Sequence, residues 1–429
     1  MNIGVISLGC AKNQVDTENM LGMLQNAGYA FVSEPDLADI LIVNTCGFIN
    51  PAKEESINAI LEMAQYKKSG RCRLLVATGC LTERYRNELT AEMPEIDLML
   101  GVHEYQQLPS LLAQKLNTPC PSHINSKRLL VSPPYRAYLR VSDGCNNRCA
   151  YCAIPLIRGN LSSVPMDILI DEAKRLADNG VTELSVIAQD TSGYGKDLYG
   201  YPQLIPLLKS LAQISSLKWI RLLYTYPDTV TEDLLDTLAQ SEKLVPYLDI
   251  PLQHCNDSIL RRMNRRGSKA HIRKILNHLY AFYPHFTLRT SLMVGFPGET
   301  DEQFRELLTF LRDYPFDRVG AFIFSPEEGT PAAEMPNQID ESVKEERFDL
   351  LMQQQQRISR ERNSRWIGRN LTLLVEETGI DGTFGRTVRE APEADGFVKI
   401  APSYKHAPGQ YIPIQIIKAD SYDLIGEEQ

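Results

Sequence analysis

The sequence lacks the features that place a protein in or across a membrane. Nowhere in its 429 residues does an apolar run approach the roughly 20 residues that cross a bilayer. The first residues, MNIGVISLGC, have neither the basic flank nor the long apolar stretch of a signal peptide, and they predict a β-strand instead. We therefore expect a cytoplasmic protein without a membrane partner.

The sequence also has too little positive charge for general binding to nucleic acid. It holds 45 Lys and Arg against 54 Asp and Glu, which gives a formal net charge of −9. Phosphate contacts need clustered Lys and Arg. A local basic groove remains compatible with this composition, so direct RNA binding stays open, but a neutral or basic partner suits the chain better.

Cysteine, in contrast, is plentiful, with nine residues in the chain. In a reducing compartment these residues are poor candidates for disulfides, because thiol buffers keep such bonds reduced. Metal binding or redox chemistry is therefore the first question that the sequence raises.

The first third of the chain predicts an α/β domain. Residues 1–116 alternate helical patterns with near-continuous apolar strands at 3–9, 39–45 and 73–79, which is typical of a parallel sheet. Residues 117–134 carry Pro and Ser with little periodicity and predict a linker.

The rest of the chain predicts a core at 135–364 and a small β-barrel at 365–429. Six strand–helix units in the core fit a barrel or partial barrel of parallel strands, and a doubly wound open sheet is the alternative. One long polar helix is expected over 339–366, and the Gly- and Pro-broken β runs that follow it predict a small antiparallel barrel. The predicted core strands lie at 137–144, 183–189, 219–224, 247–252, 287–296 and 319–325.

The sharpest motif is the spacing CxxxCxxC formed by Cys145, Cys149 and Cys152. Three thiolates this close can hold one face of a 4Fe–4S cluster, which normally takes four Cys ligands, so one iron would stay open for a substrate or cofactor. A structural zinc site is the alternative, but it usually needs four ligands, and no nearby His or Cys completes the set. The motif follows the first predicted core strand, where the active sites of parallel barrels form.

A second set of cysteines occupies one repeated position in the N-terminal domain. Cys10, Cys46 and Cys80 each follow a predicted strand and precede a helix. The carboxyl ends of parallel strands share one sheet edge, so these residues are expected to converge there. Three ligands would again leave an open iron on a second cluster. Cys72, Cys120 and Cys255 share neither pattern and fit packing or surface roles better.

The motif CxxxCxxC with Tyr151 before its last cysteine resembles the radical-SAM signature. That resemblance implies that Cys145, Cys149 and Cys152 hold a 4Fe–4S cluster whose open iron chelates S-adenosylmethionine (SAM). Reduction of the cluster would then split SAM into methionine and a 5′-deoxyadenosyl radical.

The whole chain resembles the methylthiotransferases, which have a three-cysteine N-terminal domain, a radical-SAM core and a C-terminal TRAM barrel. SLGCAKNQVDTENMLG, NTCGFINPAKEES, TGCLTERY and AQDTSGYGKDLY look like the RimO-type subgroup, which modifies an aspartate of small-subunit ribosomal protein S twelve. The subgroup that modifies isopentenyl-adenosine in tRNA usually has a different residue after the first cysteine. Cys10-Ala-Lys12-Asn, together with Gly47-Phe48, is therefore the most discriminating evidence.

The resemblance implies a set of cofactors and binding residues. Two 4Fe–4S clusters and SAM are expected, the auxiliary cluster on Cys10, Cys46 and Cys80. Gln189 and Asp190 stand where the family usually has an acidic glycine-rich motif that meets the SAM amino group. Gln253 and Arg289, on later core strands, are expected either to contact SAM or to make hydrogen bonds within the barrel. The basic run at 261–269 is expected to be a solvated face.

The implied activity is transfer of a methylthio group to the β-carbon of an aspartate in ribosomal protein S twelve, with an electron donor such as a flavodoxin or ferredoxin. From residue 364 onward the chain has seven basic and ten acidic residues, a balance that suits a basic protein better than RNA. The alternatives are methylthiolation of tRNA adenosine and a non-enzymatic zinc-binding module.

Overall fold

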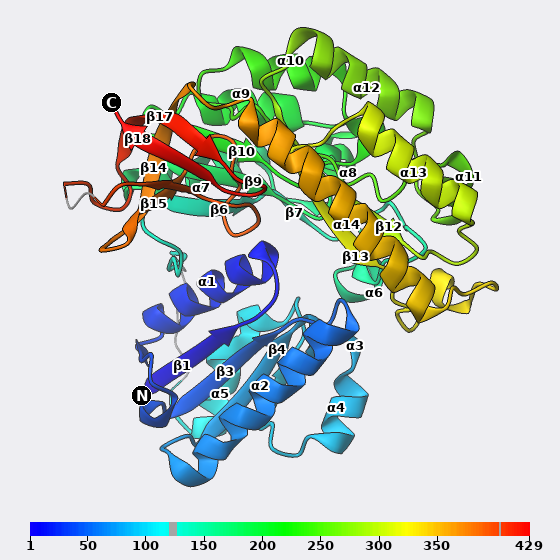
Figure 1. Cartoon of the computed structure of the whole chain (residues 1–429). Coiled ribbons are helices and arrows are strands. Elements are labelled where there is room, and N and C mark those ends of the chain that lie inside the picture. Colours follow the sequence, from blue (N-terminus) through cyan, green and yellow to red (C-terminus); the bar gives the residue numbers. More distant parts are fainter. Residues whose placement is uncertain (120–126, 403–404) are drawn as a thin grey trace.

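The computed structural model of the chain describes residues 1–119, 127–402 and 405–429 (Figure 1). It contains an N-terminal domain, a larger core and a small C-terminal barrel. Part of the predicted linker, with Cys120, lies outside the described residues. No helix in the described ranges has both the length and the apolar character that a membrane span requires.

The N-terminal domain is a five-stranded parallel sheet in the order β2-β1-β3-β4-β5, as the apolar strands predicted. Helices α1 and α5 bury Leu24 and Leu112 against one face of the sheet, and α2 buries Ile60 and Met63 against the other. The central strands β3 and β4 are buried along their whole length, which is why their sequences are continuously apolar. The elements of this domain are β1 (Asn2–Ser7), α1 (Ala11–Asn26), β2 (Ala30–Phe31), β3 (Ile40–Thr45), α2 (Asn50–Ser69), β4 (Leu74–Gly79), α3 (Cys80–Arg84), α4 (Arg86–Glu92), β5 (Leu98–Leu100) and α5 (Leu108–Leu116).

The core is a partial barrel made of two three-stranded parallel sheets, β10-β9-β6 and β11-β12-β13. A bridge between Ile220 and Leu244 joins the two sheets. All six predicted strands are present, and helices alternate with them: β6 (Arg136–Arg140), β7 (Ser142–Asp143), α6 (Ile154–Ile157), β8 (Ser162–Ser163), α7 (Met166–Asp178), β9 (Glu183–Ile187), α8 (Lys196–Tyr199), α9 (Leu204–Ala212), β10 (Trp219–Leu222), α10 (Glu232–Gln240), β11 (Tyr247–Asp249), α11 (Asp257–Arg262), α12 (Lys269–Phe282), β12 (Thr287–Val294), α13 (Asp301–Asp313) and β13 (Arg318–Ile323).

The long helix α14 (Glu341–Ser364) packs along β13 and leads into the C-terminal barrel (Figure 1). The barrel is closed in the order β14-β15-β16-β18-β17. The prediction of an antiparallel barrel was wrong in one respect, because β16 and β18 pair in parallel. A closed ring with an odd number of strands cannot alternate direction throughout, so five strands require at least one parallel pair. Its strands are β14 (Asn370–Gly379), β15 (Gly382–Arg386), β16 (Val398–Ile400), β17 (Tyr411–Ala419) and β18 (Leu424–Glu428).

Buried ion pairs fix the C-terminal barrel to the core. Glu183 at the start of β9 accepts a 2.6 Å hydrogen bond from Arg386 of β15 and lies 3.3 Å from Arg221 of β10. Burial alone would raise the pKa of Glu183, but the two guanidinium groups overcome this effect and hold the pKa below its usual value. Asp317 pairs in the same way with Arg362 of α14. Although α14 has a polar sequence, part of it is therefore buried, because its charged side chains have charged partners in the interior.

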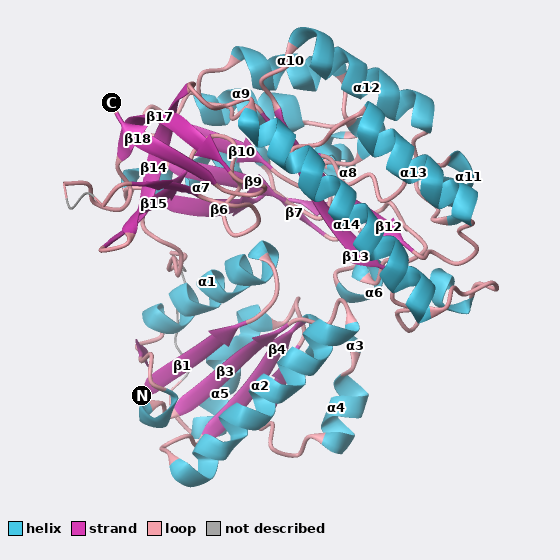
Figure 2. Ribbon diagram, viewed as in Figure 1, coloured by secondary structure: helices cyan, strands magenta, loops and turns pink. Residues whose placement is uncertain are grey.

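Other ion pairs join the N-terminal domain to the core. Arg158, which follows α6, lies 2.8 Å from Asp16 of α1. Glu327, beyond β13, lies 2.9 Å from Lys53 of α2 and 3.3 Å from Arg84 of α3. Figure 2 shows the arrowheads of β1, β3 and β4 directed toward the core. The carboxyl edge of the N-terminal sheet is therefore the edge that meets the core.

Candidate functional site

The structure brings the three strand-end cysteines of the N-terminal domain together. Cys10 is the residue before α1, Cys46 follows β3, and Cys80 begins α3 directly after β4. Burial is the main cause of the raised pKa of Cys80, and Cys10 and Cys46 are close enough to raise it further through their charges. Gly9 makes this approach possible, because a Cβ atom there would lie 3.0 Å from Cys46 Cβ in a backbone with φ of +91°.

Two polar side chains contact the Cys80 thiol, and one of them comes from the core. The Cys80 thiol donates to Asn13 Oδ1 at 3.4 Å, and Arg158 Nη2 lies 3.7 Å from Cys80 Sγ. Burial raises the pKa of the Cys80 thiol to about 12, and Arg158 opposes that shift. The thiolate therefore forms readily only when a positive charge, such as that of a bound metal, compensates it. Sequence reasoning missed Arg158, because nothing in its local sequence connects it to the N-terminal domain.

The second group lies on the loop between β7 and α6. The loop is held by backbone hydrogen bonds from Cys145 N to Gly159 O at 3.1 Å and from Ala150 N to Met263 O at 2.8 Å. Burial, together with the charges of neighbouring groups that include the other thiols of the motif, raises the pKa of Cys145 to about 11 and that of Cys152 to about 12. The structure thus places all three thiols of the CxxxCxxC motif within electrostatic reach of one another.

Arg265 contacts this second group directly, so the prediction that 261–269 is a solvated face was wrong at this residue, whereas Arg261 and Arg266 are exposed as predicted. Its side chain is only 7% exposed. Nη1 lies 3.6 Å from Cys149 Sγ and donates to Tyr151 Oη at 3.3 Å, and the guanidinium lies 4.3 Å above the Tyr226 ring. Tyr226 Oη is itself 3.8 Å from Cys149 Sγ. The charge run gave no sign of these contacts, since they come from tertiary packing.

Asp190 lies beside the cysteine loop. Its Oδ2 accepts a 2.7 Å hydrogen bond from Asn147 Nδ2, and its Oδ1 accepts bonds from Ser192 Oγ and Gly193 N at 2.6 and 3.2 Å. Gln189 precedes it and is half-buried. Asp190 therefore positions the loop that carries Cys145 and Cys149, whether or not it also meets a ligand.

Gln253 and Arg289 lie on the second half of the core. Gln253 has a φ of +69°, and its backbone bonds Ser291 and Met293 of β12. Arg289 Nη1 lies 3.0 Å from Asp249 Oδ1 and Nε lies 3.7 Å from Asp395 Oδ1 of the C-terminal barrel. Arg289 thus makes one ion pair within the core and one with the C-terminal barrel, and its contact with SAM stays a prediction.

The donor sets fit clusters better than a single ion. Within the described residues, no three His, Cys, Asp or Glu side chains are arranged as ligands of one metal ion. A 4Fe–4S cluster makes a different demand, because its thiolates bind separate iron atoms. Each cysteine group also has a guanidinium near a sulfur atom, from Arg158 or Arg265, which suits a negatively charged thiolate-bound cluster.

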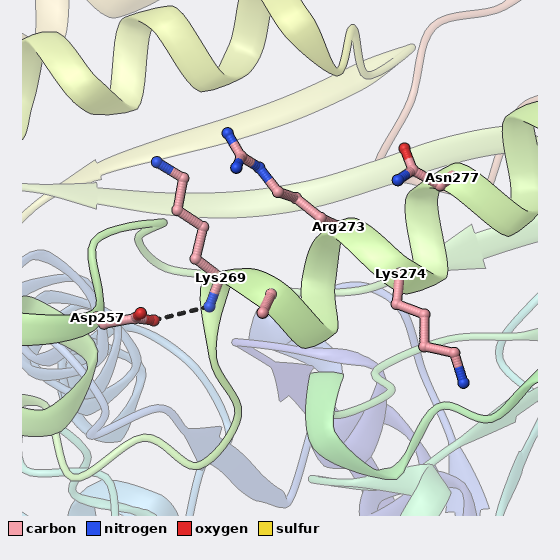
Figure 3. A pocket seen from close by; sticks show the side chains of 6 residues that line it. Asp257, Lys269, Arg273, Lys274 and Asn277 are labelled. Carbon is pink, nitrogen blue, oxygen red and sulfur yellow. Dashed lines mark hydrogen bonds between the residues drawn. The ribbon is translucent and has the colours of Figure 1, made fainter.

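An open groove of about 620 Å³ lies along α12 and the start of α11 (Figure 3). The Asp257 carboxylate accepts a 2.7 Å hydrogen bond from Lys269 N at the start of α12. Lys269 pairs with Glu306 and Lys274 pairs with Glu232. None of the predicted site residues lines this groove.

Comparison with known families matches all three parts of the chain. Residues 2–101 match the family described as Uncharacterized protein family UPF0004, residues 139–311 match the Radical SAM superfamily, and residues 367–428 match the TRAM domain. A protein of Acetivibrio thermocellus named Ribosomal protein uS12 methylthiotransferase RimO is 45% identical over 443 residues, which cover 99% of this chain and 98% of that protein. A protein of Geobacter sulfurreducens with the same name is 45% identical and has the same coverage.

The chain belongs to the RimO family of ribosomal protein uS12 methylthiotransferases. This confirms the resemblance inferred from the motifs and makes the chain a radical-SAM enzyme. Among solved structures, the radical S-adenosylmethionine methyltransferase TsrM from Kitasatospora setae matches with a TM-score of 0.55 and 13% identity, covering 77% of this chain and 76% of that one. At that identity the match shows the fold, which the RimO family shares with other radical-SAM enzymes.

Proposed function

We propose that this chain attaches a methylthio group to the β-carbon of an aspartate in ribosomal protein uS12. Two 4Fe–4S clusters and SAM are its cofactors. Cys145, Cys149 and Cys152 would hold the cluster that binds SAM, and Cys10, Cys46 and Cys80 would hold the auxiliary cluster. This division gives three domains, with a linker between the first two. The domains span residues 1–116, 135–364 and 365–429, and the linker spans 117–134.

One observation carries the proposal: the segment that follows the core cysteines packs against the N-terminal cysteine group at the junction of the two domains. Ala153 and Ile157, just after the last cysteine of the core group, pack against Cys80 of the other group. Arg158 then contacts Cys80 Sγ from the same segment. Two sites this close can act on one substrate atom in sequence.

The clusters, when bound, supply one-electron reduction of SAM and an iron site for sulfur. The chain's own residues orient and enclose this chemistry. Arg265 and Tyr226 hold Cys149, and the Asn147–Asp190 hydrogen bond fixes the loop. Tyr151, Gln189, Asp190, Gln253 and Arg289 are the proposed SAM-binding residues. Of these, Tyr151, Asp190 and Arg289 already make polar contacts that would hold them in fixed orientations.

The partner proposal follows from the substrate. The enzyme would act in the cytoplasm on uS12 and receive electrons from a small carrier such as a flavodoxin or ferredoxin. The C-terminal barrel has three more acidic than basic residues from residue 364 onward, so its charge favours a basic protein over RNA.

The test is an anaerobic turnover assay with reconstituted protein, SAM and a strong reductant. A uS12 peptide with the target aspartate and unmodified tRNA are offered in separate reactions and read by mass spectrometry. A methylthio mass gain on the peptide alone is expected. A gain on tRNA alone would keep the chemistry and overturn the substrate, and a gain on neither would overturn the proposed activity.

A further inference from the structure

We propose that Lys12 is a specificity-determining residue that binds the side-chain carboxylate of the target aspartate. Lys12 lies in the first turn of α1, two residues after Cys10. Its ammonium reaches across the domain junction, so that Nζ lies 3.1 Å from the centroid of the Tyr224 ring in the core. This places a cation between the N-terminal cysteine group and the interior of the barrel.

The Lys12 side chain is largely buried, and its ammonium, which is not among the atoms cut off from solvent, has no anionic partner among the described residues. The residue is 5% exposed. Across residues 1–119, 127–402 and 405–429, its ammonium makes no hydrogen bond and has no carboxylate within 4.0 Å, and the Tyr224 ring is the group it faces. A buried charge is costly unless it is paired. A ring face compensates only part of that cost, so the site favours an anion that comes with a ligand.

The residues around Tyr224 are arranged so that they do not supply this anion. Tyr224 follows β10 in a left-handed conformation, with φ of +61°, and its backbone N–H donates to Asp249 Oδ2 at 2.8 Å. The other oxygen of Asp249 accepts from Arg289 at 3.0 Å. The nearby carboxylate is therefore already occupied by Arg289 and the backbone. A non-glycine residue in this conformation is uncommon and is kept only where the surrounding structure fixes it.

The positive charge of Lys12 would distinguish an aspartate from a tRNA adenosine as the substrate. An aspartate presents a carboxylate one bond from the β-carbon that is to be modified, whereas an adenine base is neutral. A lysine also has a flexible four-carbon stem, so its ammonium can leave the ring face and follow an incoming carboxylate. The inference rests on the proposed function, since it assigns the group that recognises the aspartate.

The test uses two uS12 peptides that differ only in the target residue, aspartate or asparagine. Both are offered together to the reconstituted full-length enzyme, and the ratio of methylthiolated products gives the ratio of kcat/KM values. The variants are Lys12→Met, Lys12→Arg and the control Lys218→Met. Lys218 is an exposed lysine that also lies over a tyrosine, 4.4 Å from the Tyr411 ring.

Wild type, Lys12→Arg and Lys218→Met are expected to prefer the aspartate peptide. In Lys12→Met the preference should fall about 30-fold or more, because one partner of a buried charge pair is missing. An unchanged preference in Lys12→Met would overturn the inference while leaving the proposed function intact.

Failure of the wild type to modify the aspartate peptide would instead overturn the proposed function. If Lys12→Met makes no product, fluorescence anisotropy with the same two peptides decides the matter. A weaker Kd for the aspartate peptide alone supports the role of Lys12, and an equal change for both peptides contradicts it.

Discussion

At the scale of single residues, the two cysteine groups are expected to have separable roles. Changing Cys149 to Ala removes a ligand from the site that would bind SAM, so formation of 5′-deoxyadenosine should be lost. Changing Cys46 to Ala should leave some 5′-deoxyadenosine formation but stop methylthiolation. Chromatography of the SAM products of both variants measures this. Equal loss in both would contradict the division of labour.

Arg265 is expected to influence the reduction of the cluster on the second group. Its guanidinium lies 3.6 Å from Cys149 Sγ, and hydrogen bonds to cluster sulfur make reduction easier. Arg265→Met should therefore lower the reduction potential, as measured by a redox titration followed by electron paramagnetic resonance. Arg261→Met, an exposed residue of the same run, is the control. A potential equal to that of the wild type would show that the contact is only structural.

The sequence identified the cysteines but missed the arginines that surround them. The cysteine spacing is local, and the repeated strand-end position of Cys10, Cys46 and Cys80 can be read from the order of predicted elements. Arg158 and Arg265 reach Cys80 and Cys149 through contacts that span 78 and 116 residues. Such pairings depend on tertiary packing, and in sequence a charge run looks the same whether it is solvated or buried.

At the scale of elements, we expect the ion pairs between β9, β10 and β15 to hold the C-terminal barrel against the core. Glu183→Gln would leave Arg221 and Arg386 buried without a full counter-charge. Breaking a buried pair in this way costs about 3–5 kcal/mol, which should appear as a lower midpoint in urea unfolding. Glu302→Gln, which removes an exposed i,i+3 pair with Arg305, should change stability by less than about 1 kcal/mol. Equal effects would contradict the importance of the buried pair.

The same carboxylates give the junction an acid dependence. Burial raises the pKa values of Glu183 and Asp317, but their guanidinium partners lower both below the usual values. The stabilisation is therefore fully present above the unfolded-state pKa, about 4 to 4.5, and is lost as pH falls through the lower folded-state pKa. Urea midpoints of the full chain should fall steeply below about pH 4.5. Glu183→Gln should show a shallower dependence, and an identical pH profile would contradict this origin.

Secondary structure was largely predictable, whereas the closure of the last barrel was not. The buried strands β3 and β4 and the six core strands appear as apolar runs in the sequence. The parallel pairing of Val398–Ile400 with Leu424–Glu428 joins segments that are not adjacent in the chain order. Short β runs do not specify which partners close a ring, so the all-antiparallel expectation failed at that pair.

At the scale of the whole molecule, Glu327 joins the N-terminal domain to the core through Lys53 and Arg84. Glu327→Gln should weaken this junction, because a 3% exposed carboxylate would lose both ion pairs. Hydrogen exchange at α2 and α3 should become faster, and more SAM should be consumed for each methylthiolated product. Lys67→Met, which breaks a pair with Asp97 within the N-terminal domain, is the control. An unchanged exchange pattern in Glu327→Gln would contradict this role.

The most direct test is the iron and sulfide content of the anaerobically reconstituted chain. Wild type should bind about eight iron atoms per chain, as two 4Fe–4S clusters require. The triple variant at Cys10, Cys46 and Cys80 and the triple variant at Cys145, Cys149 and Cys152, all changed to Ala, should each bind about four. Zinc in place of iron, or equal iron contents in wild type and either variant, would contradict a two-cluster enzyme.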